Sequence, residues 1–427
     1  MTSTGEIAAG VRPRLTVSIG LRVFFPFALG YFLSYLFRTV NAVIGPDLVA
    51  ELGIDAAGLG LLTSAYFLSF AAFQLPLGIL LDRFGPARTE ALLLLFAAGG
   101  AFLFAFAHST PQLVVARAFI GFGVSACLMA AFKSFVSWFP AGKLPLINGG
   151  IMAAGGLGAL SATAPVEAAL SFTDWRGIFT GLGIATLVVS IAVILIVPKR
   201  PPEATGTGFR EQLAGIAEIF ASPAFWRVVP LTMASQAAFM SIQGLWAGPW
   251  LLDVGGVARD QAAQLLFAMA AFQIAGYLGF GWTAERLSRL GVPTTAVALV
   301  GMIISMCIQS VLLLQPTHYL VVLVAAIGFF GSAGIVTYAA LSQSFPSHLA
   351  GRVNTGINTL VFFFAFATQA GMGAIISLFP QPSHGANAPD GYGAAFGAII
   401  AIQIAGLAWY ALAPRLFGAK KSRQARG

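Results

Sequence analysis

The chain has 427 residues, of which 58% are hydrophobic and 9% charged, and its formal net charge at pH 7 is +8. Soluble domains carry roughly 25% charged residues, so this composition excludes a water-soluble globular protein. The positive charge does not indicate a nucleic-acid partner, because the basic residues do not cluster on one soluble face.

Long apolar runs follow one another along the chain. A helix of about 20 apolar residues crosses a bilayer core, because every backbone polar group must be paired internally there. The predicted fold is therefore all-α and integral to a membrane. We predict about twelve transmembrane helices, with approximate centres at Leu33, Phe70, Ala98, Val124, Leu157, Val188, Ala237, Phe272, Ile304, Gly328, Phe366 and Ile402.

The first run carries an arginine among small and aromatic residues, Gly30-Tyr31-Phe-Leu-Ser-Tyr35-Leu-Phe-Arg38-Thr-Val-Asn41. An arginine deep in an apolar span is costly without a partner, and it attracts a carboxylate that it can hold through two parallel hydrogen bonds. Arg38 is therefore a candidate anion ligand. The alternative is a packing arginine whose guanidinium is satisfied by backbone carbonyls.

Charged residues and two glycines connect the second and third runs, namely Gly78, Asp82, Arg83, Gly85 and Arg88. We expect a short loop here, in which Gly85 permits a tight reversal and the charged groups meet at the membrane surface. A similar stretch, with Glu285 and Arg286, lies between Gly281 and Gly291. This repeat predicts that the chain is a duplicated membrane bundle.

Ionisable residues also occur in the fourth and fifth runs. Arg117 is followed by Gly121 and Gly123, and both helix packing and a role in coupling are open for it. Lys133 either extends to the membrane interface or forms a second cationic station. Glu167, near the end of the fifth run, either takes a transported proton, if desolvation favours its neutral form, or caps the span.

A polar, proline-rich stretch that begins at Pro198 separates the two halves of the chain. Residues 209–220 then have the mixed polarity of a cytoplasmic amphipathic helix. We predict an N-terminal bundle over residues 1–197, a cytoplasmic linker over 198–225, and a C-terminal bundle with a basic tail over 226–427.

Basic residues concentrate on one side of the predicted spans. That side carries Arg12, Arg14, Arg22, Arg83, Arg88, Lys143, Lys199, Arg200, Arg210, Arg227, Arg286, Arg289, Arg352, Lys420, Lys421, Arg423 and Arg426. The opposite side has little beyond Arg176 and Arg259. The positive-inside rule therefore predicts cytoplasmic termini in a bacterial-type inner membrane. The first run lacks a signal-peptide cleavage site.

The sequence contains no pattern for a bound cofactor. Cys127 and Cys307 each lie inside an apolar run without a nearby partner, so neither disulfide nor metal-ligand spacing is present. No nucleotide-binding loop occurs either. We expect no cofactor, no metal and no enzymatic activity.

The stretch from Gly78 to Arg88 closely resembles the signature motif between helices two and three of the major facilitator superfamily, and Arg117 with its Gly-x-Gly resembles a second motif. The resemblance implies two pseudo-symmetric six-helix bundles that rock around a central site. It also implies a conformational latch, although Pro86-Ala87 replaces the usual basic residues and implies a weaker one. The alternative is that these charges only fix topology. We use the term latch for Gly78, Asp82, Arg83, Gly85, Arg88, Glu285 and Arg286.

The first run resembles the opening of two anion-handling branches, the anion:cation symporters and the organophosphate:phosphate antiporters, in which its arginine binds the substrate anion. Gln74-Leu-Pro76-Leu-Gly78 follows the symporter pattern and lacks the antiporters' lysine. The resemblance thus implies Arg38 as the anion ligand. One cation balances a phosphate dianion poorly, so a singly charged organic anion fits better. We expect the polar lining to comprise Tyr31, Tyr35, Asn41, Gln74 and Gln243.

Two departures from the superfamily's patterns bear on coupling and substrate. The acid that symporters carry on helix four is replaced by Val124-Ser125, so we expect coupling to involve Arg117 and Glu167, with Asp47 as the next candidate. The fifth run also lacks the Gly-Pro pair of drug/proton antiporters.

The expected function is proton-coupled uptake of a small carboxylate by a monomeric secondary transporter that works by alternating access. The alternative is proton-antiport efflux of a metabolite or drug. A membrane sensor or structural protein is a third possibility, but it would need a soluble output domain, and the sequence predicts none.

Overall fold

A computed structural model describes residues 17–140, 143–198, 217–346, 349–381 and 386–424, and nearly all of them are helical. The N-terminal half contains α1 (Val17–Thr39), α2 (Asn41–Leu52), α3 (Ala56–Phe84), α4 (Pro86–Ala105), α5 (Thr110–Val124), α6 (Cys127–Trp138), α7 (Leu144–Ser161), α8 (Ala164–Leu170) and α9 (Trp175–Ile196). The C-terminal half contains α11 (Pro223–Ser241), η2 (Ile242–Trp246), α12 (Ala247–Asp253), α13 (Arg259–Arg289), α14 (Thr294–Ser310), η3 (Val311–Leu314), α15 (Leu320–Gly331), η4 (Ser332–Gly334), α16 (Ile335–Gln343), α17 (Ala350–Ile376) and α18 (Pro389–Gln424).

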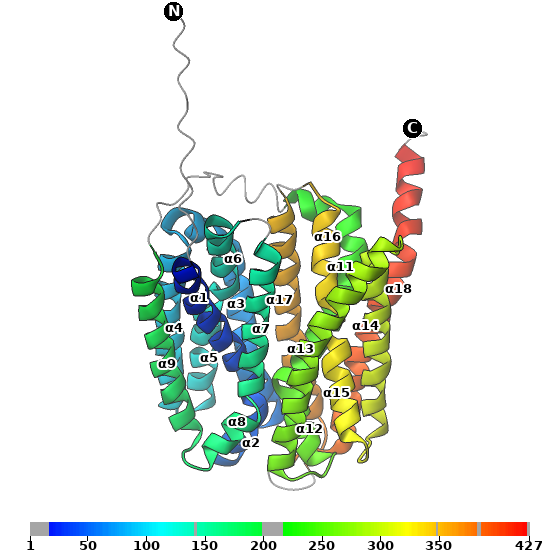
Figure 1. Cartoon of the computed structure of the whole chain (residues 1–427). Helices are drawn as coiled ribbons and strands as arrows, with labels where there is room; N and C mark the ends of the chain where they lie inside the picture. Colours follow the sequence, from blue (N-terminus) through cyan, green and yellow to red (C-terminus); the bar gives the residue numbers. More distant parts are fainter. Residues whose placement is uncertain (1–16, 141–142, 199–216, 347–348, 382–385, 425–427) are drawn as a thin grey trace, which may run out of the picture.

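The described helices confirm the predicted all-α membrane fold. Eleven segments among the described residues are long and apolar enough to cross a membrane. A further continuous segment is formed by α11, η2 and α12, and Figure 1 places α11 and α12 toward opposite ends of the bundle. Its sequence includes the glutamines Gln236 and Gln243, which lower its apolarity. These glutamines line the central cavity described below.

The two halves lie side by side and meet along α3 and α17 (Figure 1). Close packing at this boundary depends on glycine. A Cβ at Gly60 would lie 3.0 Å from the carbonyl oxygen of Gln369, and one at Gly373 would overlap that of Ala56. Small residues let membrane helices approach closely, so α3 and α17 form a tight seam between the halves.

Helix α1 begins and α18 ends at the same end of the bundle, which we call the terminal end (Figure 1). Arg83, Arg227 and Arg352 lie at helix ends on this side, whereas Arg176 and Arg259 begin helices at the opposite end. The side chains of the predicted tail, including Lys420, Lys421 and Arg423, are not described. The following predicted features lie outside the described residues: Arg12, Arg14, Lys199, Arg200, Arg210, Arg426 and residues 209–216 of the linker helix.

The charged stretch from Gly78 is helical, so the predicted loop is shorter than expected. Helix α3 continues to Phe84 and α4 begins at Pro86, so Gly85 alone separates them. Gly85 has a φ of +80°, which L side chains rarely adopt, and it makes the predicted tight reversal. The helix persists because its backbone hydrogen bonds do not require apolar side chains.

Several long segments are interrupted within their length. Helix α1 gives way to α2 at Val40, α5 gives way to α6 at residues 125–126, and η2 and η4 interrupt two segments of the C-terminal half. The residues at these positions keep right-handed helical dihedral angles, so the interruptions are local changes in hydrogen bonding and each segment continues through them.

Candidate functional site

A cavity of about 480 Å³ lies between the two halves, a volume typical of small-molecule sites. The helix interruptions contribute Thr39, Ser125 and Gly244 to its wall. Five predicted site residues line this cavity, namely Tyr31, Tyr35, Arg38, Gln74 and Gln243. Their role in binding stays a prediction.

Arg38 is the only charged side chain in the described lining of the cavity, and it is 9% exposed. Its Cζ lies 4.3 Å from the ring centroid of Tyr35 and 4.9 Å from that of Phe362. No described carboxylate forms an ion pair with it, and its Nε has no hydrogen-bond partner. Aromatic faces stabilise a cation without using its N–H donors. The site therefore presents a guanidinium with donor capacity for an anion.

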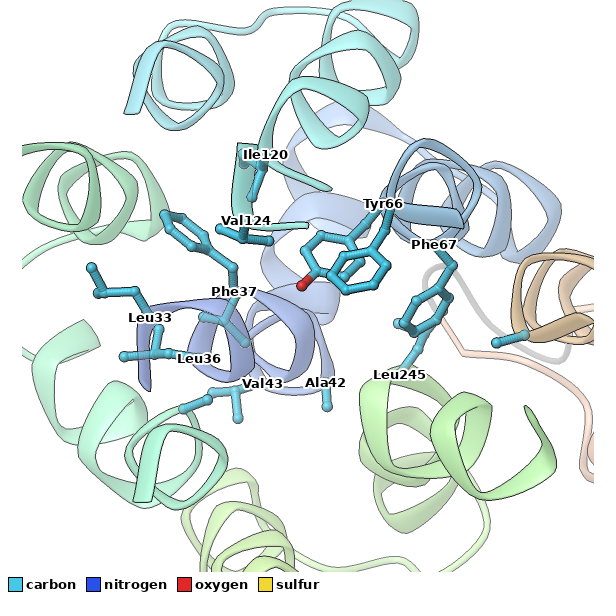
Figure 2. Close-up of a cluster of buried hydrophobic side chains, with 14 of the residues drawn as sticks. Leu33, Leu36, Phe37, Ala42, Val43, Tyr66, Phe67, Ile120, Val124 and Leu245 are labelled. Atoms are coloured by element: carbon cyan, nitrogen blue, oxygen red, sulfur yellow. The ribbon is translucent and has the colours of Figure 1, made fainter. Parts of the chain in front are cut away.

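Arg117 fixes the backbone next to Arg38. It is fully buried, and its Nη1 donates a hydrogen bond of 2.8 Å to the carbonyl oxygen of Phe37. This carbonyl lies in the last turn of α1, where the helix leaves its final acceptors unpaired. Figure 2 shows Phe37 and Val124 facing each other where α1 packs beside α5. Arg117 does not line the cavity, so its contact with the site runs through the backbone.

Tyr66 supports α1 from the other side. Its hydroxyl group, directed toward α1 in Figure 2, donates to the carbonyl oxygen of Ser34 at 3.1 Å. Its ring centroid lies 6.0 Å from Cζ of Arg38 and 5.5 Å from Cζ of Arg117. One aromatic side chain on α3 therefore packs against both buried cations.

Asn41 lies outside the cavity, contrary to the prediction that it lines the site. It is fully buried, and its amide donates to Oγ1 of Thr63 at 2.9 Å. The two side chains have different surroundings, since the Asn41 amide binds Thr63 of α3 whereas Arg38 lines the cavity. Gln74 does line the cavity, and its amide donates to the carbonyl oxygen of Ser125 at 3.2 Å.

The C-terminal half contributes uncharged polar groups. Nε2 of Gln243 donates to Oε1 of Gln273 at 2.7 Å, and Nε2 of Gln273 donates to the hydroxyl of Tyr277 at 2.9 Å. Asn354 and Asn358 lie on the same face of α17 and also line the cavity. This wall places both donors and acceptors in the same cavity as Arg38 of the other half.

The sequence analysis did not identify several residues that line the cavity, although each lies four positions from another polar or aromatic residue and so shares a helical face with it. Phe70 lies four residues after Tyr66, Tyr277 four after Gln273, and Asn358 four after Asn354. The polar pairs stand out in apolar runs. The aromatic residues around Arg38 do not, because phenylalanine and tyrosine in a membrane span fit ordinary packing equally well.

The latch acid Asp82 pairs with Lys133, which links the end of α3 to α6. Lys133 does not line the cavity, so the structure places it in this ion pair and not in a second cationic station. In the second half, Arg289 pairs with Glu285 at 2.5 Å on the same helix. Arg286 packs on the ring of Trp282, and Arg83 on that of Phe84. The two copies of the motif therefore differ in their described ion pairs, since that of the first joins two helices and that of the second stays within one.

An ion-pair network bridges the two halves at the end opposite the terminal end. Arg259 of α13 binds both carboxyl oxygens of Asp47 on α2, at 2.6 and 2.5 Å, and its Nε lies 2.9 Å from Glu167 on α8. Asp47 and Glu167 belong to the N-terminal half and Arg259 to the C-terminal half. Glu167, predicted to be a coupling residue, thus lies in a bridge between the halves.

The described residues contain no group of three histidine, cysteine or acidic side chains that could hold a metal ion. Cys127 is buried and Cys307 is exposed, and both are free thiols. The described lining of the cavity offers hydrogen-bonding groups, one guanidinium and aromatic faces.

Comparison with known proteins identifies the family. The model of the family described as Major Facilitator Superfamily matches residues 27–367. This chain belongs to the Major Facilitator Superfamily. The first-named relatives align over only part of their length. The Probable sulfoacetate transporter SauU of Cupriavidus necator is 30% identical over 159 residues, which cover 37% of each chain. The Probable L-galactonate transporter of Escherichia coli is 25% identical over 265 residues, which cover 58% of each chain.

A longer alignment and a solved structure agree with the superfamily fold. The Probable galactarate/D-glucarate transporter GudP of Bacillus subtilis is 23% identical over 379 residues, which cover 81% of this chain and 83% of the relative. A bacterial homologue of the human lysosomal transporter Spinster, crystallised in an inward-facing and unoccupied conformation, superposes with a TM-score of 0.73. It is 18% identical, and the match covers 94% of this chain and 98% of that one, so the likeness concerns the fold.

Proposed function

We propose that this protein is a secondary transporter that carries a small organic anion across a bacterial inner membrane by alternating access. The observation that carries the proposal is Arg38, a buried guanidinium without a carboxylate partner among the described residues, in a cavity between the two halves. A transporter of this superfamily has no nucleotide to hydrolyse, so we propose that a proton gradient drives uptake.

The wall of the cavity favours a singly charged, polar substrate. One guanidinium grips one carboxylate or sulfonate through two parallel hydrogen bonds. The amides of Gln243, Gln273 and Asn354 can then bind hydroxyl groups of the same ligand. The relatives named for sulfoacetate, galactonate and glucarate support an organic acid as the substrate. Of these compounds, galactonate has the single acidic group that one guanidinium can balance, whereas sulfoacetate and glucarate have two acidic groups each.

Alternating access is supported by the asymmetry of the two ends. The Arg259 network joins the halves at one end, whereas the cavity extends past Phe132 to Gly351 near the terminal end. With the termini in the cytoplasm, as the basic helix ends favour, this arrangement corresponds to an inward-facing state. We further propose that the bundles correspond to residues 1–197 and 226–427 and that a monomer is the transporting unit.

A binding screen with an arginine substitution tests the proposal. Purified protein is exposed to sulfoacetate, L-galactonate and glucarate and, separately, to lipophilic cations, and the thermal shift is measured. We expect shifts with anions that disappear in Arg38→Ala and in Arg38→Lys, because an ammonium cannot reproduce a bidentate fork. Arg22→Ala, an exposed arginine on the same helix, is the matched control and should retain the shift.

The screen also separates the alternative function. Stabilisation by lipophilic cations, with no effect of the anions, would favour efflux of a drug or metabolite by proton antiport. Anion binding that is unchanged in Arg38→Ala would contradict the proposed site, while leaving the family membership intact.

A further inference from the structure

An unpartnered carboxyl group lies inside the N-terminal half. Glu90, in the second turn of α4, is fully buried, and neither of its carboxyl oxygens has a hydrogen-bond partner among the described residues. Its Oε1 lies so close to Gly30 of α1 that a Cβ there would overlap it. An ionised carboxylate in such surroundings is very costly, so the site favours a carboxyl that carries a proton.

The titratable groups in the surroundings of Glu90 come from four helices, α1, α3, α5 and α6. The thiol of Cys127 on α6 lies beside it, since a Cβ at Gly30 would contact both the carboxyl group and this thiol. Arg38 of α1 and Tyr66 of α3 both interact electrostatically with Cys127. Two more helices, α5 and α9, pack against α4. Helix α5 carries Arg117, which donates to the carbonyl oxygen of Phe37. Helix α9 carries the uncharged Ser190, whose hydroxyl donates to the carbonyl oxygen of Ala91.

We propose that Glu90 is the carboxyl group that binds and releases the transported proton, because it is buried without a partner at the junction of α1, α4 and α6 and reaches the Arg38 site through Cys127. This inference rests on the proposed function, since it supplies the proton site of an anion:proton symporter. It differs from the sequence-based expectation, which placed coupling at Arg117 and Glu167.

Charge balance explains how Glu90 and the anion site communicate. In the proposed mechanism, an ionised Glu90 adds a negative charge to the same half of the molecule as Arg38, and a substrate anion then gains less from binding. When Glu90 is protonated, the positive charge of Arg38 is uncompensated and attracts the anion more strongly. Proton and anion therefore favour each other's binding, and this coupling is reciprocal. That is the thermodynamic requirement for symport.

The other acidic candidates have different surroundings. Glu167 and Asp47 both bind Arg259 at the closed end, and their side chains are 19% and 29% exposed. A carboxylate with a guanidinium partner is stabilised in its charged form. Opening of that end would separate these pairs, so Glu167 remains the rival for the same role and is included in the test.

The first experiment measures anion affinity as a function of pH in detergent, with sulfoacetate and L-galactonate as the probes. For wild-type protein we expect the affinity to fall with rising pH by up to about tenfold per pH unit. Glu90→Gln, which mimics the neutral carboxyl, should bind as tightly as the wild type does at acidic pH and show no such dependence. Glu218→Gln, at an exposed glutamate that precedes α11, is the matched control and should keep the wild-type profile.

The second experiment separates proton coupling from transport. In proteoliposomes, Glu90→Gln should retain anion exchange but lose net uptake driven by a pH gradient, whereas Glu90→Asp should retain both in part. Gradient-driven uptake that persists in Glu90→Gln would overturn the inference while leaving the transport proposal intact, and loss in Glu167→Gln alone would assign the role to Glu167. Wild-type anion transport without any response to pH would overturn both the inference and the proton-driven part of the proposal.

A third measurement needs neither substrate nor transport. Infrared difference spectra of wild-type protein should contain the carbonyl band of a buried, protonated carboxyl group at neutral pH, and Glu90→Gln should lack it. The absence of any band that depends on Glu90 would overturn the inference, whether or not the probe anions bind. Failure of the probe anions to bind would count separately against the proposed function.

Discussion

At the residue scale, the two buried arginines have different tasks. Arg38 lines the cavity, whereas Arg117 holds the carbonyl oxygen of Phe37 and leaves its Nε and Nη2 without partners. A buried guanidinium with two unpaired nitrogens is a poor contribution to stability by itself. We therefore expect Arg117 to position the end of α1, and with it Arg38, for binding.

Replacement of Arg117 tests this positioning role. Arg117→Met keeps much of the volume but leaves the Phe37 carbonyl unpaired, which costs about 1–3 kcal/mol of stability. We expect anion affinity to fall roughly tenfold as well, since 1.4 kcal/mol of lost preorganisation has that effect. Thermal unfolding and anion binding are measured in parallel, with Arg22→Met as the control. Lower stability with unchanged affinity would mean that Arg117 only packs the helices.

At the element scale, the connection between α3 and α4 depends on Gly85 and on the pair between Asp82 and Lys133. This pair ties α3 to α6 within the N-terminal half. The corresponding pair of the C-terminal half joins residues of one helix and is largely exposed, with side chains 68% and 65% accessible. Such exposed pairs contribute little, so we expect the latch to act mainly through its first copy.

The latch prediction concerns rate and not affinity. Asp82→Asn should slow turnover in proteoliposomes while anion affinity stays within a few-fold of wild type, because Asp82 is absent from the cavity lining and biases a conformational equilibrium. Glu285→Gln should change neither quantity. Equal transport rates for Asp82→Asn and wild type, together with unchanged accessibility of cysteine probes at both ends, would show that the motif sets only topology.

At the scale of the whole molecule, the Arg259 network joins the two halves at one end. Its ion pairs are partly exposed, so each contributes on the order of 1 kcal/mol, equivalent to about a fivefold shift in an equilibrium between two states. Arg259 bridges the two halves, whereas Arg176 pairs with Glu51 inside the N-terminal half at 2.5 Å. Arg176 is therefore a matched control at the same end.

We predict that Arg259→Gln opens this end. Spin labels at Ala50→Cys on α2 and Gln261→Cys on α13, in a background without Cys127 and Cys307, report the distance between the halves. The distribution should gain a longer component in Arg259→Gln and remain unchanged in Arg176→Gln. High salt should act in the same direction as Arg259→Gln, since it screens exposed charges. Identical distributions in both variants would show that helix packing alone keeps the end closed.

The sequence by itself determined the membrane fold, the duplication, the reversal at Gly85 and much of the candidate site. Hydropathy reports span length, and helical spacing reports which residues share a face, as with Tyr31, Tyr35 and Arg38. Only the tertiary structure decided that Asn41 lies outside the cavity, that Lys133 pairs with Asp82 and that Glu167 binds Arg259. Each of these outcomes depends on which other helix a face meets, and periodicity along one helix does not contain that information.

Glu90 shows the same limit most clearly. In the sequence Glu90 lies two residues after Arg88 and resembles an ordinary acid near a helix start, where the helix dipole favours negative charge. In the structure Gly30 and Cys127, distant in the chain, enclose it. The protonation state of a carboxyl group is governed by desolvation and by its partners, and both are properties of the packed bundle.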